Sequence, residues 1–130
     1  MGKNRPLIAV VDDEEPIRKA LTRLLRSAGL DVESFPSGVE FLESIPTRRP
    51  DCVLLDLHMP GLNGFEVQAR LAKFSAPVPV VIITGHDSAD SRDRALAGRP
   101  AAYLRKPVND QTLLDAIELA LSQNRPRSNP

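Results

Sequence analysis

The 130-residue chain lacks several features that mark particular classes of protein. Tryptophan is absent, and the single cysteine, Cys52, cannot form an internal disulfide, which fits a reducing cytoplasm. Lys and Arg together number 17, as do Asp and Glu, so the formal net charge is zero. This balance argues against a nucleic-acid-binding surface or a polybasic membrane patch in this segment. No apolar run approaches transmembrane length, and the first one is too short for a signal peptide.

Short apolar runs alternate with amphipathic segments along the whole chain. The runs predict strands at 7–11, 32–35, 52–55, 79–83 and 101–104. Helices are predicted to begin near Pro16, Ser37, Gly64, Ser88 and Asn109. Because the runs are continuous, the strands should be covered on both faces, as in a parallel sheet with helical crossovers. The sequence therefore predicts an α/β fold with helices on both faces of a five-stranded sheet.

The chain length suits one domain with its own core, which we assign to residues 1–123. Residues 124–130, NRPRSNP, are polar and proline-rich and predict a tail or the start of a linker. In the second predicted helix we expect Val39, Leu42 and Ile45 to point into the core. The fourth predicted helix, 88–97, is rich in charge and poor in large apolar residues.

Polar residues follow four of the five predicted strands. Asp12 and Asp13 follow the first strand, Asp56 the third, Thr84 the fourth and Lys106 the fifth. In open parallel sheets, ligands bind at the carboxyl ends of the strands, which lie along one edge. We therefore expect three carboxylates, one hydroxyl and one ammonium to converge there.

These side chains suit a magnesium-dependent phosphoryl acceptor. Clustered acids raise one another's pKa unless a cation is present, and Mg²⁺ prefers oxygen ligands. A carboxylate such as Asp56 can act as a nucleophile and form an aspartyl-phosphate, with Lys106 as counter-charge and Thr84 as a hydrogen-bond donor. Taken singly, the residues allow plainer roles: the first two acids as helix caps, Lys106 as a solvated lysine and Thr84 as an N-cap. Their joint placement favours the metal and phosphoryl site.

Four segments together resemble the receiver domain of two-component response regulators. They are VVDDEE at 10–15, LLDLHMPGLNG at 54–64, VVIITGH at 80–86 and YLRKPV at 103–108. The segments occur in the family's order over about residues 7–123, and ITGH and LHMPG are most similar to the FixJ-like subgroup. The resemblance implies a flavodoxin-like (βα)5 fold with strand order 2-1-3-4-5.

The resemblance also implies a role for each acid. Asp56 would accept phosphate from a sensor histidine kinase or a phosphotransfer protein. Asp13, Asp56 and the backbone carbonyl of His58 would bind Mg²⁺, for which Mn²⁺ can substitute. Asp12 would assist through water. The activity implied is a signalling switch with stoichiometric self-phosphorylation and slow autodephosphorylation, without enzymatic turnover.

Further implied roles concern the switch. Lys106 would contact the phosphoryl group, with a cis peptide bond before Pro107. Thr84 and Tyr103 would form the switch pair: the hydroxyl moves to the phosphate and the ring turns inward. The face made of the fourth helix, fifth strand and fifth helix would then control dimerisation or an output domain. FixJ-like proteins usually continue into a DNA-binding domain, so transcription regulation is the expected output, with the DNA read outside this domain.

Two features depart from the family's common pattern. Gly98, Arg99 and Pro100 stand near the place where the family often has Gly-Ala, so we expect an altered turn after the fourth helix. His58 and His86, the only histidines, lie two residues after Asp56 and Thr84. We predict that one or both tune dephosphorylation near neutral pH; the alternative is that they are exposed loop histidines without a role.

Two other functions compete with the switch. A pseudo-receiver would bind a protein partner without taking phosphate, but the intact acids, Thr84 and Lys106 speak against it. A phosphatase with an Asp nucleophile typically has a second Asp two residues further on, where this chain has His58. A mass gain from a small phosphodonor, its absence, or turnover of a phosphoester would distinguish the three.

Overall fold

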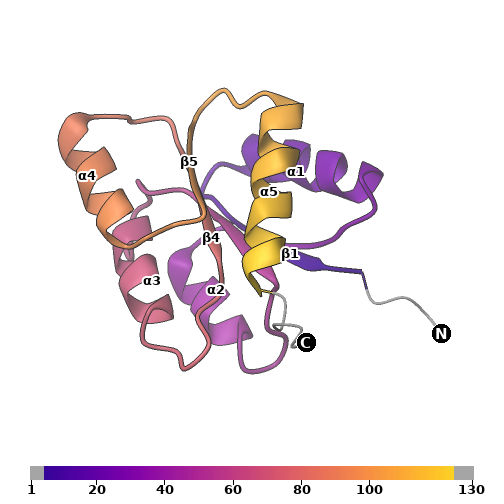
Figure 1. Cartoon of the computed structure of the whole chain (residues 1–130), viewed down its shortest axis with the longest axis horizontal. Coiled ribbons are helices and arrows are strands. Elements are labelled where there is room, and N and C mark those ends of the chain that lie inside the picture. Colours follow the sequence, from indigo (N-terminus) through magenta and orange to yellow (C-terminus); the bar gives the residue numbers. More distant parts are fainter. Residues whose placement is uncertain (1–4, 125–130) are drawn as a thin grey trace, which may run out of the picture.

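A computed structural model describes residues 5–124 and has a five-stranded sheet between two layers of helices (Figure 1). The strands are β1 (Leu7–Val11), β2 (Asp31–Phe35), β3 (Cys52–Leu55), β4 (Val80–Thr84) and β5 (Ala102–Arg105). All pairs are parallel and the order is β2-β1-β3-β4-β5, which confirms the predicted flavodoxin-like fold. The order in which strands are added reverses between β1 and β3, and in sheets of this kind ligands bind at the carboxyl ends of the strands beside that point.

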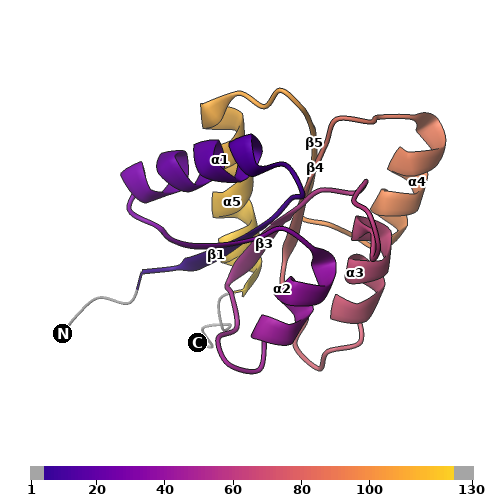
Figure 2. The ribbon, with the colours of Figure 1, turned by 180° about the vertical axis from the view of Figure 1, so that it is seen from behind.

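The helices are α1 (Glu15–Ser27), α2 (Gly38–Ser44), α3 (Gly64–Leu71), α4 (Ala89–Ala97) and α5 (Asp110–Asn124). Helices α1 and α5 cover one face of the sheet, and α2, α3 and α4 cover the other (Figures 1 and 2). Successive side chains of a strand point to opposite faces, so β1 sends Ile8 and Val10 to one core and Ala9 and Val11 to the other. The continuous apolar run of β1 is therefore buried throughout.

The second helix presents part of the face predicted for it: Ile45 is buried and Leu42 packs against the core, as expected, but Val39 does not. Val39 is 49% exposed, so its predicted core position is wrong, whereas Phe41 is fully buried. In an α-helix, residues two apart lie on nearly opposite sides, and residues four apart share a face. Phe41 and Ile45 therefore lie on the inward side together with Leu42, which packs against the same core, and Val39 faces solvent.

In the turn after α4, the left-handed backbone conformation falls on an arginine and not on the glycine before it. Gly98 has φ −82°, while Arg99, an L-residue, has φ 55°. Gly98 leaves room for the Gln68 side chain: a Cβ there would lie 2.7 Å from the Gln68 Nε2, whose amide donates a hydrogen bond to the Ala95 carbonyl. This hydrogen bond ties α3 to the end of α4.

Strands β4 and β5 and helix α5 end close to the limits predicted for them. Strands β4 and β5 each run one residue later than predicted, so Thr84 and Arg105 are their last residues. Helix α5 extends to Asn124, and residues 125–130 of the predicted tail lie outside the described part of the chain. Within residues 5–124, no helix is long and apolar enough to cross a membrane.

Candidate functional site

Three carboxylates meet at the carboxyl ends of β1 and β3. These strands are adjacent, with Val11 opposite Leu55, so the residues that follow them are also neighbours. Carboxylate oxygens of Asp12, Asp13 and Asp56 all lie within 4.8 Å of one another. Asp12 and Asp56 are 3% and 5% exposed, whereas Asp13 is open to solvent. The cluster is therefore a mostly buried acidic site that is reached from one side.

Lys106, which follows β5, supplies the cluster's positive charge. Its Nζ lies 2.8 Å from an Asp12 oxygen, 3.5 Å from Glu14 and 3.7 Å from Asp56. Burial lowers the pKa of Lys106, but the hydrogen bond to Asp12 and the charges of Asp56, Asp12 and Glu14 outweigh it and raise the pKa above its ordinary value. The ammonium thus stays charged. The peptide bond between Lys106 and Pro107 is cis.

The carboxylate of Asp56 is held in an unfavourable charged state. Burial raises its pKa to about 6; Lys106 opposes this shift, Asp12 and Asp13 add to it, and the backbone N–H of His58 opposes it again by donating a hydrogen bond. One ammonium therefore does not compensate three acids. The missing positive charge and the all-oxygen donor set fit a hard divalent cation such as Mg²⁺.

The three acids are not equally available to a cation. One oxygen of Asp12 accepts a hydrogen bond from the Glu14 N–H at 2.9 Å, and the other accepts one from Lys106. Asp12 is thereby fixed in orientation. Asp13 and Asp56 are therefore freer than Asp12 to coordinate an ion directly.

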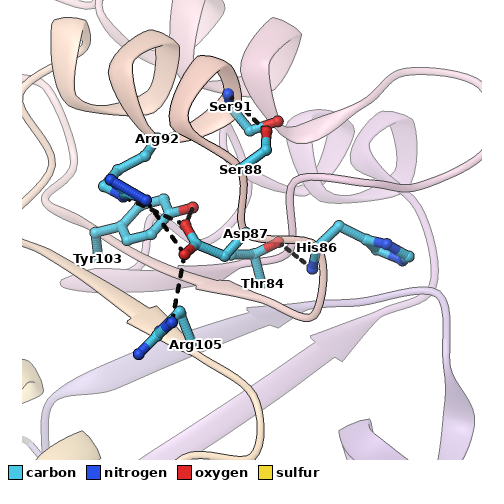
Figure 3. Close-up of polar contacts among 8 residues, drawn as sticks. All are labelled: Thr84, His86, Asp87, Ser88, Ser91, Arg92, Tyr103 and Arg105. Carbon is cyan, nitrogen blue, oxygen red and sulfur yellow. Dashed lines mark hydrogen bonds and ion pairs between the residues drawn. The ribbon is translucent and has the colours of Figure 1, made fainter.

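The Thr84 and Tyr103 hydroxyls both bind residues of the loop between β4 and α4 (Figure 3). Thr84 is fully buried, and its Oγ1 accepts a hydrogen bond from the His86 N–H at 3.0 Å. The Tyr103 hydroxyl donates to Asp87 Oδ1 at 2.8 Å. The two side chains come from adjacent strands, with Ile82 opposite Tyr103. The structure thus brings both to the same loop but gives them different partners.

The two histidines lie together at the rim. Their ring centroids are 5.0 Å apart in an edge-to-face arrangement, and both side chains are exposed. His58 also packs edge-on against Phe65, over which the Arg94 guanidinium lies at 4.1 Å from the ring centroid. The pair therefore links the loop after β3 to the loop after β4.

Three residues of the site were not singled out from the sequence. Glu14 contacts Lys106, and Asp87 binds Tyr103. Gly64 lies against the loop after β3: a Cβ there would be 2.3 Å from the Asp56 carbonyl oxygen and 2.7 Å from the Leu57 Cα. Glu14 and Asp87 lie within three residues of predicted site residues, so searching the flanking acids would have found them.

Comparison with known proteins agrees with this geometry. The profile of the family described as response regulator receiver domain matches residues 8–118. Nodulation protein W of Bradyrhizobium diazoefficiens is 38% identical over 126 residues, covering 97% of this chain and 56% of that protein. The transcriptional regulatory protein FixJ of the same organism is 36% identical over 119 residues, covering 92% and 58%. This chain therefore spans about half the length of these relatives.

Solved structures show the same architecture. A response regulator receiver protein from Burkholderia phymatum is 47% identical, with a TM-score of 0.81, and the match covers 91% of this chain and 96% of that one. The response regulator StyR is 40% identical, with a TM-score of 0.84, over 93% of this chain and 61% of that one. The acidic cluster, the strand order and these matches together place the chain in the receiver domain family of two-component response regulators, whose members are signalling switches.

Proposed function

We propose that Asp56 accepts a phosphoryl group from a phosphohistidine on a sensor kinase or a phosphotransfer protein. The observation that carries this proposal is the buried Asp56 carboxylate, set among two other acids with Lys106 at 3.7 Å. An Asp56 oxygen attacks phosphorus, a P–O bond forms, and the P–N bond to the histidine breaks. Water later cleaves the acyl phosphate and returns the carboxylate and inorganic phosphate.

Each residue of the cluster has its own role in this reaction. With a pKa of about 6, Asp56 is mostly ionised at neutral pH and serves as nucleophile without a separate base. Lys106 follows β5 at the same edge and contacts the phosphoryl oxygens as negative charge builds up. Asp13, Asp56 and the His58 carbonyl would hold Mg²⁺, with Asp12 acting through water. The bound ion supplies the positive charge that the three acids lack.

The switch follows from partners that change on phosphorylation. The Thr84 hydroxyl leaves the His86 N–H and donates to a phosphoryl oxygen, and the Tyr103 ring turns inward. The face formed by α4, β5 and α5 then differs between the two states, which biases an equilibrium already present in the free protein. We assign to this face the control of a homodimer or of an output domain that regulates transcription.

A groove beside the site suits the phosphodonor protein. It has a volume of about 820 Å³ and lies between α1 and α5, with Ile17, Leu21 and Leu24 on one side and Lys106 and Leu113 among its other residues. Its apolar lining favours an amphipathic helix. Because the groove includes Lys106, a helix bound there would hold its phosphohistidine next to the acceptor cluster.

The two histidines complete the proposal as residues that tune dephosphorylation. Their rings are in contact at the rim, next to the loop that carries Asp56. We expect His58→Asn and His86→Ala to change the lifetime of the phosphorylated protein. Lifetimes equal to that of the wild type in both variants would assign these side chains no role.

Phosphoryl uptake tests the proposal directly. The protein is incubated with acetyl phosphate and Mg²⁺ and its intact mass is measured. We expect a gain of one phosphoryl group, lost in Asp56→Ala and with EDTA. No gain under any condition would favour a pseudo-receiver, and repeated turnover of an unrelated phosphoester would favour a phosphatase.

A further inference from the structure

Asp87 connects the loop after β4 to both α4 and β5. Its Oδ1 accepts the Tyr103 hydroxyl at 2.8 Å and lies 3.4 Å from Arg92 Nε, while its Oδ2 lies 3.4 Å from another nitrogen of Arg92 and 3.5 Å from Arg105. Figure 3 shows the three side chains gathered around this carboxylate, with the His86 ring directed away from it. Neither the acceptor nor the metal role proposed above uses Asp87.

The tyrosine bond is the strongest of these links. The Arg92 and Arg105 side chains are 45% and 72% exposed and their contacts are long, and exposed ion pairs of this kind contribute little. The Asp87 side chain is only 18% exposed, and its bond to Tyr103 is short and charge-assisted. This bond lowers the pKa of Asp87, and burial followed by the same bond raises that of Tyr103. At neutral pH both groups are therefore in the forms that keep the bond.

The second switch residue, Thr84, holds the same loop next to Asp87. Thr84 Oγ1 accepts the His86 N–H, one residue before Asp87. Rotation of the Thr84 side chain toward a phosphoryl group would break that bond and leave the His86 N–H without this partner unless the loop moves with it. Asp87 restrains the same segment through β5. The two hydrogen bonds therefore resist the same rearrangement.

We propose that Asp87 is a positioning residue that holds Tyr103 and the loop after β4 in the resting arrangement and so opposes switching. This inference rests on the proposed function, because it assumes that Thr84 and Tyr103 rearrange when Asp56 is phosphorylated. Removing the carboxylate raises the population of the switched arrangement before any phosphoryl group binds. A ligand that prefers this arrangement then binds more tightly, because less of its binding energy is used for the rearrangement.

The test compares Asp87→Ala with Asp90→Ala, which removes an exposed acid and the same charge from the first turn of α4. The chain has one tyrosine and no tryptophan, so ultraviolet titration of the phenol reports on Tyr103 alone. Asp87→Ala should lower the pKa of Tyr103, and Asp90→Ala should leave it near the wild-type value. This first readout requires no phosphorylation.

The second readout is the affinity for beryllofluoride with Mg²⁺, a phosphoryl analogue that does not react further. We expect about ten-fold tighter binding in Asp87→Ala, the effect of losing one charge-assisted hydrogen bond. Tyr103→Phe removes the same bond from the other side and should give a similar gain. The double variant should gain no more than either single variant. Should Asp87→Ala not fold, Tyr103→Phe and Asp87→Asn provide the test.

The outcomes separate this inference from the proposed function. Normal beryllofluoride binding by the wild type with no gain in the variants would overturn the role of Asp87 alone. An unchanged Tyr103 pKa in Asp87→Ala would overturn it as well, without bearing on phosphorylation. If neither wild type nor variant binds the analogue, the proposed function fails and the opposing role of Asp87 fails with it.

Discussion

Asp56 and Asp87 lie at the same edge of the sheet, yet their pKa values are shifted in opposite directions. Burial raises the pKa of Asp56 to about 6, and neighbouring acids add to the shift. The Tyr103 hydroxyl and two arginines lower the pKa of Asp87. One carboxylate therefore lacks positive charge, and the other has both oxygens satisfied.

The same contrast separates two halves of the sheet edge formed by the carboxyl ends of the strands. The acceptor half, at the ends of β1 and β3, contains three acids around Lys106. The switch half, at the ends of β4 and β5, contains hydrogen bonds that hold Thr84 and Tyr103 to one loop. In the proposed function, an added cation and phosphoryl group stabilise the acceptor half, whereas the switch half must break existing hydrogen bonds to rearrange. Signalling then depends on whether the stabilisation of the acceptor half outweighs the hydrogen bonds lost in the switch half.

The largest expected effect tests the rigidity of the acceptor half. In Gly64→Ala the new Cβ would meet the backbone of Asp56 and Leu57, which cannot move aside without displacing the acceptor. We expect a loss of about 3–5 kcal/mol in the free energy of unfolding by urea, or failure to fold. Gly61→Ala is the control, because Gly61 has φ 73° and no atom near a Cβ, so the change costs about 1 kcal/mol. Equal losses would contradict the close packing described here.

The next prediction sharpens the contrast between the two carboxylates. The pKa of Asp56 is raised from 3.8 to about 6 on folding, so the stability of the wild type falls as pH rises through this window and then stays low. Without divalent ions at neutral pH, Asp56→Asn should therefore raise the free energy of unfolding by about 1–3 kcal/mol. The gain should shrink toward about pH 4, where the wild-type acid is protonated.

Asp87→Asn should have the opposite sign. Its lowered pKa means that the ionised carboxylate stabilises the fold above the ordinary pKa of 3.8, and that this contribution is lost as pH falls toward the folded-state value. The variant should be less stable than wild type at neutral pH and approach it in acid. Urea unfolding of both variants across pH measures the comparison, and a gain in both would remove the distinction between the halves.

Metal binding should follow the protonation of Asp56. A cation competes with the proton for this carboxylate, so Mg²⁺ affinity should be steady at neutral pH and fall by up to about ten-fold per pH unit below about 6. Calorimetric titration with Mg²⁺ at several pH values measures this. Asp87→Asn serves as the control and should keep the wild-type profile. A profile without a break near this pKa would remove Asp56 from the metal site.

Sequence patterns predicted the fold well because they depend on local chemistry and sheet topology. The five apolar runs fixed the strands within about one residue, and their order placed Asp12, Asp56 and Lys106 at one edge. The pattern could not show that Lys106 lies closer to Asp12 than to Asp56, since side-chain distances depend on packing across the sheet. Val39 was misplaced because a seven-residue helix contains too few apolar residues to define its buried face.

The smallest predicted effect concerns the turn after α4. Arg99 has φ 55°, where L-residues are strained, so Arg99→Gly should raise the free energy of unfolding by up to about 1 kcal/mol. Gly98→Ala should lower it instead, because its Cβ would collide with the Gln68 amide. Thermal unfolding of the two variants distinguishes strain from space. Stabilisation by both changes would contradict the described turn.

The most direct test of the central claim identifies the residue that carries the phosphoryl group. After incubation with acetyl phosphate and Mg²⁺, borohydride reduction converts an aspartyl-phosphate to homoserine, which peptide mass spectrometry can locate. We predict homoserine at position 56, with Asp12, Asp13 and Asp87 unmodified. Reduction at any of those three positions, or a protein without reduced aspartate after phosphoryl uptake, would contradict the account.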